Sequence, residues 1–397
     1  MFKHNHEHIE TTLGDIATFQ KSYSFSREME GEGFVRHIHY GDIHTKLPSV
    51  ITNHGILPTI IENKDFQLIS YGDILIADAS EDYKDLGKAV CYLDDTENPV
   101  ISGLHTHRFN IDNEKVIPEY LINIFQTHRY RKFVWRMGTG VSVLGLSKSN
   151  LEKFPIYFPS NDIQKKVAHF FNFINRKLYL QQEIIDLLKE QKKGYMQKLF
   201  KQELRFKEKN KVDYPAWKKI KLGKLTKKTG KKNSEGMRYP VAAISNKKGF
   251  TLEGEKNYSN ADVDIKAYKL VHKNEFAYNP ARINVGSFGF QNVADIAIVS
   301  SLYVIFKTLP TLSNAYLKAY MHSSYFNRDV IKNTEGSVRE YLFYENFSNI
   351  KIPLPCIKEQ EKIAEFLLKI DSKIQLEERK LESLQEQKKW FMQQMFI

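Results

Sequence analysis

The sequence repeats itself at a constant offset of 196 residues. Residues 159–200 align without a gap with residues 355–396, and 16 of the 42 positions are identical. The strongest part compares 188–200 with 384–396, which share the run Glu-Gln-Lys-Lys. Chance does not give such similarity over 42 ungapped positions. We therefore interpret the chain as a duplicated pair, and a repeat constrains the fold more than any single motif.

Both copies of the repeat have the periodicity of a long amphipathic helix. Their seam positions are mostly spaced by four and three residues, as in a coiled coil. A proline opens each copy (Pro159 and Pro355), which suits a helix that starts after an extended segment. An apolar stripe of this length needs a partner, and the other copy can supply it. We expect two antiparallel helices forming an intramolecular coiled coil; ordinary core packing within each half is the alternative. The seam positions are Ile163, Val167, Phe170, Ile174, Leu178, Gln181, Ile185, Leu188, Lys192, Tyr195 and Leu199, then Ile363, Phe366, Ile370, Ile374, Leu381, Leu384, Phe391 and Met395.

The segments before each helix resemble one another more weakly. Leu-Gly-Asp-Ile at 13–16 is similar to Leu-Gly-Lys-Leu at 222–225, and 71–75 falls opposite 272–277. Runs at 66–77, 241–244 and 296–307 predict strands, the first as two strands about a Gly-Asp turn, and 119–136 and 314–332 predict helices. We predict an α+β fold of two β-rich domains in a pseudo-two-fold arrangement. The predicted boundaries are 1–158 for the first domain, 159–205 for the first helix, 206–354 for the linker and second domain, and 355–397 for the second helix.

The charge is concentrated in the middle of the chain. The net charge is +12, and residues 189–232 alone hold 17 basic residues and four acidic ones. Such a local positive field favours a polyanion such as nucleic acid, although a solvated helix end and linker would have the same composition. No run is long and apolar enough for a membrane span and no signal peptide is visible, so we expect a cytoplasmic protein. Two cysteines, Cys91 and Cys356, predict free thiols.

Four short motifs lie in a duplicated order along the chain. They are Leu-Gly-Asp-Ile at 13–16, Gly-Asp-Ile-Leu at 72–75, the apolar-Pro passages ending in Gln164 and Gln360, and Asn-Pro-Ala-Arg-Ile-Asn-Val-Gly at 279–286. Together they resemble the specificity subunits of type I restriction-modification systems, over nearly the whole chain. Each motif is weak alone. Their duplicated order, with a long helix closing each half, is specific.

The resemblance implies a non-catalytic subunit with two target-recognition domains, each of which reads one half of a split DNA site. The helices would set the spacing and dock methyltransferase subunits. Expected partners are double-stranded DNA, modification (methyltransferase) subunits and restriction (endonuclease and translocase) subunits. We expect no cofactor in this chain, with S-adenosylmethionine, ATP and Mg belonging to the partner subunits. Alternatives are a specificity subunit of a modification-only or fused restriction system, and a stand-alone DNA-binding coiled-coil protein.

Candidate DNA contacts are side chains that can read base edges or hold phosphates. For each of them, plain surface charge is the competing interpretation. In the first domain the candidates are Arg36, His37, His39, Tyr40 and Lys46, which lie in and after a strand-like segment at 34–43, together with Arg108 and Arg136. In the second domain they are Lys231, Lys232, Asn246, Lys247, Lys248, Arg282, Asn284 and Arg339.

Self-contained catalysis has little support in the sequence. Asn279-Pro280 resembles the start of an adenine-methyltransferase motif, but Ala281 and Arg282 follow and no Gly-x-Gly loop precedes it. The His-x-His pairs at 4/6/8, 37/39 and 105/107 could share a strand face, yet further ligands are not clustered near them. Asp73 and Glu275 fall at predicted turns, so we interpret them as structural. A purely structural scaffold would not explain why the domains diverged while the helices stayed alike.

Overall fold

The computed structural model describes residues 9–62, 64–96, 98–208, 210–246, 249–252, 265–334 and 341–396. The chain divides into two compact units. Unit 1 contains residues 1–182 and 379–397, and unit 2 contains residues 183–378. Each unit therefore holds a domain together with about half of each long helix.

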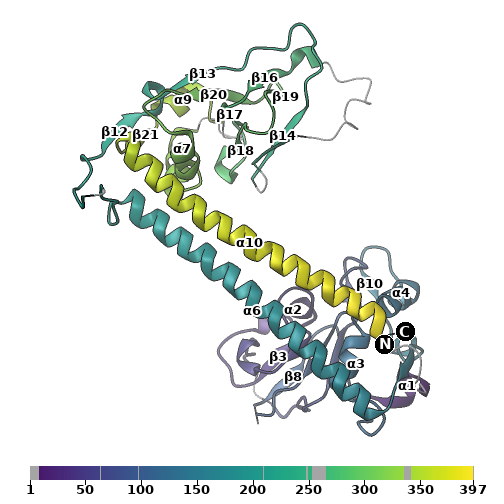
Figure 1. Ribbon diagram of the computed structural model, residues 1–397. Coiled ribbons are helices and arrows are strands. Elements are labelled where there is room, and N and C mark those ends of the chain that lie inside the picture. The colour runs from purple at the N-terminus through teal and green to yellow at the C-terminus, as the bar shows by residue number, and fades with distance from the viewer. Residues whose placement is uncertain are drawn as a thin grey trace. The chain divides into compact units, whose positions relative to one another are not determined.

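The two predicted long helices are present (Figure 1). Helix α6 spans Asn161–Phe200 and α10 spans Ile357–Met395. Every predicted seam position on either helix is buried or half-buried. The seam is therefore the packed face of each helix, as its spacing predicts.

The helices run antiparallel within each unit, as predicted. In unit 2 the Lys192 Nζ lies 2.5 Å from the Asp371 Oδ1, and the Lys189 Nζ lies 2.7 Å from the Glu378 Oε1. Residue numbers thus fall along α10 as they rise along α6. In unit 1, the rings of Phe170 and Phe391 pack with their centroids 4.9 Å apart.

Unit 1 is built on a five-stranded sheet whose strands lie in the order β2-β9-β5-β7-β4. One face packs against helices and against the start of α6, around Phe109, Tyr130 and Phe171. The other face packs against α2 and neighbouring strands. The elements before α6 are β1 (Ile9–Thr12), α1 (Leu13–Ile16), β2 (Ala17–Gln20), η1 (Arg27–Met29), β3 (Arg36–Ile38), α2 (Tyr40–Thr45), β4 (Val50–Ile51), η2 (His54–Ile56), β5 (Ile74–Ala77), β6 (Ala79–Ser80), β7 (Ala89–Tyr92), β8 (Val100–Ser102), β9 (Thr106–Ile111), α3 (Pro118–Ile124), α4 (His128–Met137), β10 (Leu144–Gly145), α5 (Lys148–Leu151) and β11 (Pro155–Phe158).

Unit 2 repeats this frame with a four-stranded sheet in the order β13-β20-β17-β18. Its helical face holds Phe276, Phe306 and Tyr316, together with Leu199 from the end of α6. The elements between α6 and α10 are β12 (Lys218–Lys221), η3 (Leu222–Lys224), β13 (Thr226–Lys228), β14 (Ala242–Ser245), β15 (Gly249–Leu252), η5 (Ile265–Ala267), β16 (Lys269–His272), β17 (Phe276–Tyr278), η6 (Ile283–Val285), β18 (Phe288–Phe290), β19 (Ile296–Val299), β20 (Val304–Thr308), α7 (Asn314–Met321), α8 (Ser324–Asn333), α9 (Tyr344–Asn349) and β21 (Lys351–Leu354).

A buried glutamine fastens the domain of unit 1 to its long helix. Gln164, in the first turns of α6, is fully buried. Its Nε2 donates to the carbonyls of Lys115 and Pro159, both at 2.9 Å. Its Oε1 accepts the backbone N–H of Ile117 at 3.0 Å. The side chain thus satisfies backbone groups of the loop that leads into α3.

Unit 2 contains the same fastening at the same offset. The Gln360 Nε2 donates to the carbonyls of Thr311 and Pro355, at 3.1 and 2.9 Å. The Gln360 Oε1 accepts the backbone N–H of Ser313 at 2.8 Å. All four residues lie 196 positions after their counterparts, so the glutamine motif in the sequence marks a repeated three-dimensional contact.

Several elements differ from the sequence prediction. Residues 66–77 contain one strand, β5, because 66–70 forms no ladder. The predicted helices at 119–136 and 314–332 are each broken in two, because Thr127 and Ser323 cap the N-termini of α4 and α8. The strand-like run 34–43 keeps only β3 as a strand. The side chain of His39 accepts the N–H of Gly41 at 3.0 Å and starts α2 instead.

No helix in the described part of the chain is long and apolar enough to span a membrane.

Candidate nucleic-acid interface

The two units share a frame but carry different inserts on the same face of the sheet. In unit 1 the chain leaves β2 and forms β3 and the short helix α2, whose Ile43 packs near Leu75 of the sheet. In unit 2 the chain leaves β13 and forms the β14–β15 hairpin, whose Ile244 packs near Ala277. A fixed frame with exchanged inserts lets each unit present its own set of polar groups.

Three predicted contacts come together in unit 2. Asn246 is exposed at the end of β14, and Arg282 is exposed at the turn between β17 and β18. Gly286 ends this turn with φ 87°, a left-handed conformation that favours glycine, and a methyl group there would lie 3.5 Å from the Asn246 Cβ. Half-buried Asn284 lies between Arg282 and Gly286. Because the Ser287 Oγ also donates to the Ile244 carbonyl at 3.2 Å, the hairpin and the turn form one surface.

Asparagine and arginine are suited to reading bases. An Asn amide can bind the N6 and N7 edge of adenine, and an Arg guanidinium can bind O6 and N7 of guanine. Lys231 and Lys232 are also exposed, but they lie on the segment after β13, at the other edge of the four-stranded sheet. Three further predicted contacts, Lys247, Lys248 and Arg339, lie outside the described residues.

The predicted contacts of unit 1 are more scattered. Tyr40 is half-buried at the start of α2, and Lys46 just after α2 is exposed, 3.3 Å from the Asp42 Oδ1. Arg36 is half-buried and its guanidinium donates to the Leu57 carbonyl. Arg136 is exposed near the end of α4, on a different element. The structure therefore groups Tyr40 and Lys46 around α2 and leaves Arg136 apart.

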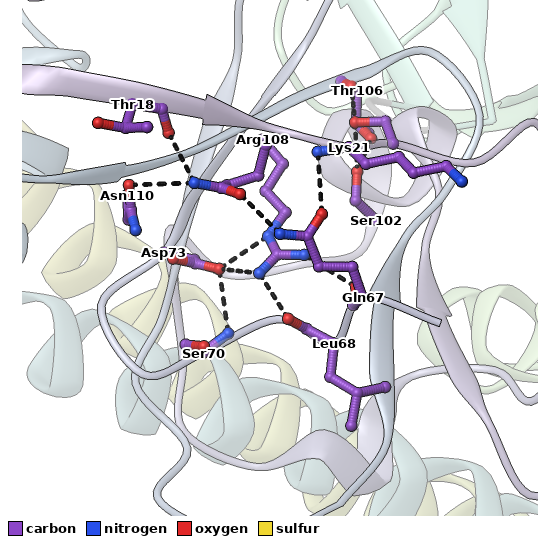
Figure 2. A network of polar contacts seen from close by, with 12 residues as sticks. Thr18, Lys21, Gln67, Leu68, Ser70, Asp73, Ser102, Thr106, Arg108 and Asn110 are labelled. Atoms are coloured by element: carbon purple, nitrogen blue, oxygen red, sulfur yellow. Dashed lines mark hydrogen bonds and ion pairs between the residues drawn. The ribbon is translucent and has the colours of Figure 1, made fainter. Parts of the chain in front are cut away.

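Arg108 is buried and structural, so we correct its assignment as a DNA contact. Only 3% of its side chain is exposed, and its Nη2 lies 2.7 Å from the Asp73 Oδ2. Figure 2 shows the remaining guanidinium donors directed at the carbonyls of Gln67 and Leu68. A guanidinium with its donors bound inside the domain cannot reach a base edge.

His37 and His39 are also buried, and their assignment is corrected for the same reason. His37 is fully buried, with its Nε2 3.3 Å from the Glu30 Oε1, and burial lowers the pKa of its ring. Burial, with a smaller effect of Arg27, lowers the pKa of His39 to about 4. A buried neutral ring offers neither charge nor access to DNA.

The sequence did not single out His105 as part of the same surface as Tyr40. His105 is half exposed in the turn before β9, and its ring centroid lies 5.3 Å from that of Tyr40. Its φ of 53° is a left-handed conformation, which is uncommon for a residue with a side chain. The His105 Nδ1 lies 3.1 Å from the Asp78 Oδ1. Only the fold brings α2 and this turn together; the polar alternation at 105–107 was the single available signal.

Asp73 and Glu275 are structural, as predicted. Each is buried and follows a residue with positive φ, Gly72 or Asn274. The Asp73 Oδ2 accepts the N–H of Ser70 at 3.0 Å, and the Glu275 Oε2 accepts that of His272 at 2.7 Å. Within the described ranges, no three or more His, Cys, Asp or Glu side chains are grouped as metal ligands. His4, His6 and His8 lie outside those ranges.

The chain matches the family described as type I restriction modification DNA specificity domain. The match occurs twice, at residues 7–190 and 216–386. These ranges cover both halves of the duplication and most of the chain. The protein therefore belongs to this family and is a DNA sequence-recognition subunit of the type I restriction-modification class.

Two curated relatives come from Methanocaldococcus jannaschii. The putative type I restriction enzyme MjaX specificity subunit is 23% identical over 81% of this chain and 76% of its own length. The type I restriction enzyme MjaVIII specificity subunit is 26% identical over 71% of this chain and 70% of its own length.

Two solved structures share the fold. The S subunit of a type I restriction-modification system from M. genitalium superposes with a TM-score of 0.59, at 13% identity, over 100% of this chain and 98% of that one. A chain from a study of complex assembly and conformational transition of the type I R-M system gives 0.57, at 14% identity, over 98% and 97%. At these identities the comparison establishes the fold of a specificity subunit, an α+β arrangement with two long helices.

Proposed function

We propose that this protein is the non-catalytic reader of a type I restriction-modification complex, in which each domain recognises one half of a bipartite DNA site. The long helices would set the distance between the half-sites and dock the methyltransferase subunits. The observation that carries this proposal is the pair of different inserts, α2 and the β14–β15 hairpin, on one repeated frame. A DNA site whose two halves differ requires two domains that have the same framework and different recognition inserts.

The chemistry of the exposed groups fits reading and not catalysis. Asn246 and Arg282 offer donors and acceptors for base edges, while the lysines of unit 2 can hold phosphates and fix register. S-adenosylmethionine, ATP and Mg would then be bound by the modification and restriction subunits. The purified chain should neither methylate nor cleave DNA, and methylation should require an added modification subunit.

A domain exchange tests this function. Residues 13–158 are replaced by the equivalent segment of another family member, and the chimera is co-expressed with its modification subunit. Methylome sequencing should show a change in one half of the methylated motif, with the other half unchanged. A motif in which both halves change together would contradict independent reading.

An insertion tests the role of the helices as a spacer. Four residues added after Gln181 lengthen α6 by about 6 Å, roughly one helical turn. The methylated motif should keep both half-sites and change the number of unspecified bases between them. An unchanged number would show that the helices do not set the distance.

A further inference from the structure

The edge of the sheet in unit 2 carries a concentration of lysine that unit 1 lacks. Residues 226–232, which form β13 and the turn after it, contain four lysines, and all four are exposed. Leu13–Ile16 of unit 1 aligns with Leu222–Leu225 of unit 2. The segment of unit 1 that is equivalent to residues 226–232 is therefore 17–23. That segment contains one lysine, Lys21.

The strand register places like charges directly opposite one another. Lys227 lies across from Lys307 on β20, and Lys232 lies across from Lys269. Facing like charges destabilise a strand pair. Burial, and then the charges of Lys228 and Lys232, lower the pKa of Lys269, which agrees with this crowding.

Among the described residues, one carboxylate pairs with a lysine of this edge. Of the lysines on this edge, Lys228 has an ion pair, 2.9 Å from the Glu345 Oε1. Lys269 is half-buried, and its Nζ donates to the Tyr303 carbonyl at 2.8 Å. The other four, Lys227, Lys231, Lys232 and Lys307, are exposed, and in the part of the chain that the structure describes no carboxylate forms an ion pair with them. We call these four residues the lysine edge. An arrangement that costs folding free energy indicates that an external anion compensates for it.

The Lys227–Lys307 pair lies on the same face of the sheet as the hairpin. Side chains alternate along a strand, so Lys307 shares a face with Ile305. Ile305 lies opposite Ala277, and both belong to the cluster that the hairpin covers. The reading hairpin and the lysine pair therefore project from one surface of unit 2.

Unit 1 has neutral groups at the equivalent positions. Thr18 lies opposite Asn110, on the face that also holds Arg108. The Gln20 Nε2 donates to the Asn110 Oδ1 at 3.5 Å, and the Gln67 Nε2 donates to the Gln20 Oε1 at 2.7 Å. Figure 2 shows Thr18 and Asn110 in this network. The lysines are thus a property of unit 2 and not of the repeated frame.

We propose that the lysine edge contacts the sugar-phosphate backbone of duplex DNA beside the half-site that unit 2 reads. Unit 2 would then supply the larger share of the sequence-independent affinity. The sheet is three strand spacings wide, about 14 Å, and the major groove is about 12 Å wide. A hairpin in the groove and lysines on the flanking phosphates are therefore compatible with one duplex. An acidic protein surface would also attract lysines, but the shared face with the hairpin favours DNA. The inference rests on the proposed function.

The test exchanges the lysine pair for the residues of unit 1. The variant is the full chain with Lys227→Thr and Lys307→Asn, and the probe is a random-sequence duplex titrated at about 50 to 200 mM salt. Each phosphate contact contributes about 0.9 to the slope of log K against log salt, so the slope should become shallower by about 1.8. Binding at about 0.1 M salt should weaken roughly 10- to 100-fold. Because a repulsive pair is removed, the melting temperature should not fall.

Two controls make the result specific. Lys273→Thr removes an exposed lysine of unit 2 that lies 3.8 Å from the Asp295 Oδ1, and it should leave the slope unchanged. Thr18→Lys with Asn110→Lys should steepen the slope by placing the same pair in unit 1. An unchanged slope in the Lys227→Thr, Lys307→Asn variant overturns the inference. Loss of methyltransferase-subunit binding with an unchanged slope would overturn it in favour of a protein partner.

Sequence selectivity separates this inference from the proposed function. The sequences that the variant selects from a random pool should match those that the unchanged chain selects. If the unchanged chain selects no sequence and yet the variant loses slope, the proposed function fails while the phosphate contact stands. If selection is normal and the slope does not move, the inference alone fails.

Discussion

The two units place chemically different side chains at one buried position of the sheet that they share. In unit 1 the strand between β2 and β5 in the sheet is β9, and its Arg108 is buried against Asp73. In unit 2 the equivalent strand is β20, and the equivalent residue is Ile305, which is fully apolar and 1% exposed. The turn carboxylate is kept in both units, as Asp73 and Glu275. The carboxylate therefore belongs to the repeated frame, whereas the arginine serves the local loop of unit 1.

The loop that Arg108 holds explains its presence. Its guanidinium bonds the carbonyls of Gln67 and Leu68, in a segment that forms no regular strand. In unit 2 the corresponding segment is β16, which pairs with β19 and satisfies its backbone in a ladder. A buried side-chain donor in unit 1 thus replaces hydrogen bonds that a strand makes in unit 2.

The largest expected effect comes from giving unit 1 the residue of unit 2. Arg108→Ile leaves the Asp73 carboxylate buried without its cation and two carbonyls without donors. Breaking a buried ion pair in this way costs about 3–5 kcal/mol. Hydrogen exchange of unit 1 peptides under increasing denaturant measures the loss, and unit 2 peptides serve as the internal reference.

The matched control for Arg108→Ile is a small apolar substitution at the equivalent position of unit 2. Ile305→Val in unit 2 removes one methylene from an equivalent site and should cost about 0.5–1.5 kcal/mol. If Arg108→Ile costs no more than Ile305→Val, the ion pair does not stabilise unit 1 and the comparison fails.

The next effect should be equal in the two units. Gln164→Ala and Gln360→Ala each leave one buried N–H and two carbonyls without the partners described above, which costs about 2–3 kcal/mol. Chemical denaturation of each variant measures this cost. Gln385→Ala, at an exposed position of α10, should change stability by less than about 0.5 kcal/mol. Losses that differ by more than about 1 kcal/mol would show that the two fastenings are not equivalent.

The sequence predicted the frame well because the frame is periodic and repeated. The seam of each helix and the turn role of Asp73 were predicted from spacing. The passages ending in Gln164 and Gln360 were identified as a repeated motif, and the structure supplies their fastening role. A motif that makes the same backbone contacts in both units occurs in both halves of the sequence, and can therefore be recognised by comparing the halves. The family assignment depended on that order of motifs.

The candidate site was less predictable because burial depends on tertiary packing. Arg108 and His37 are polar residues in a polar-looking segment, and nothing local distinguishes a buried donor from an exposed one. The Lys227–Lys307 pair required the strand register, since the two residues are 80 positions apart. Asn246 and Arg282 were each predicted as DNA contacts. That they lie close together could not be predicted, because their proximity depends on the turn at Gly286.

A smaller effect separates the reading surfaces of the two units. Asn246→Ala should relax specificity at one position of the second half-site, with a loss of about 1–3 kcal/mol in discrimination. Tyr40→Phe in unit 1 should affect the first half-site and leave the second unchanged. Sequencing of the methylated motif for both variants shows which half is affected. A relaxed first half-site in Asn246→Ala would contradict the assignment of the hairpin to the second half.

The smallest effect concerns two lysines at equivalent positions of the long helices. In unit 2 the Lys192 Nζ pairs with Asp371 at 2.5 Å. In unit 1 its counterpart is Lys388, whose Nζ donates to the amide oxygen of Gln126 at 2.7 Å. Burial lowers the pKa of Lys388 to about 8. The two units should therefore differ in how their stability depends on pH.

The direction follows from proton linkage. An unfolded lysine has a pKa of about 10.4, so between about pH 8 and pH 10 the unfolded chain keeps a proton that folded Lys388 has released. The free energy of unfolding of unit 1 should then rise with pH, by about 1 kcal/mol from about pH 8 to pH 9, and this gain is absent below about pH 8. Lys388→Met should remove this rise, because a methionine side chain does not bind or release a proton. Lys192→Met in unit 2 is the matched control and should leave the rise in unit 1 intact. Denaturation at several pH values, followed by hydrogen exchange in each unit, measures both variants. A rise that persists in Lys388→Met would assign the pH dependence to another group.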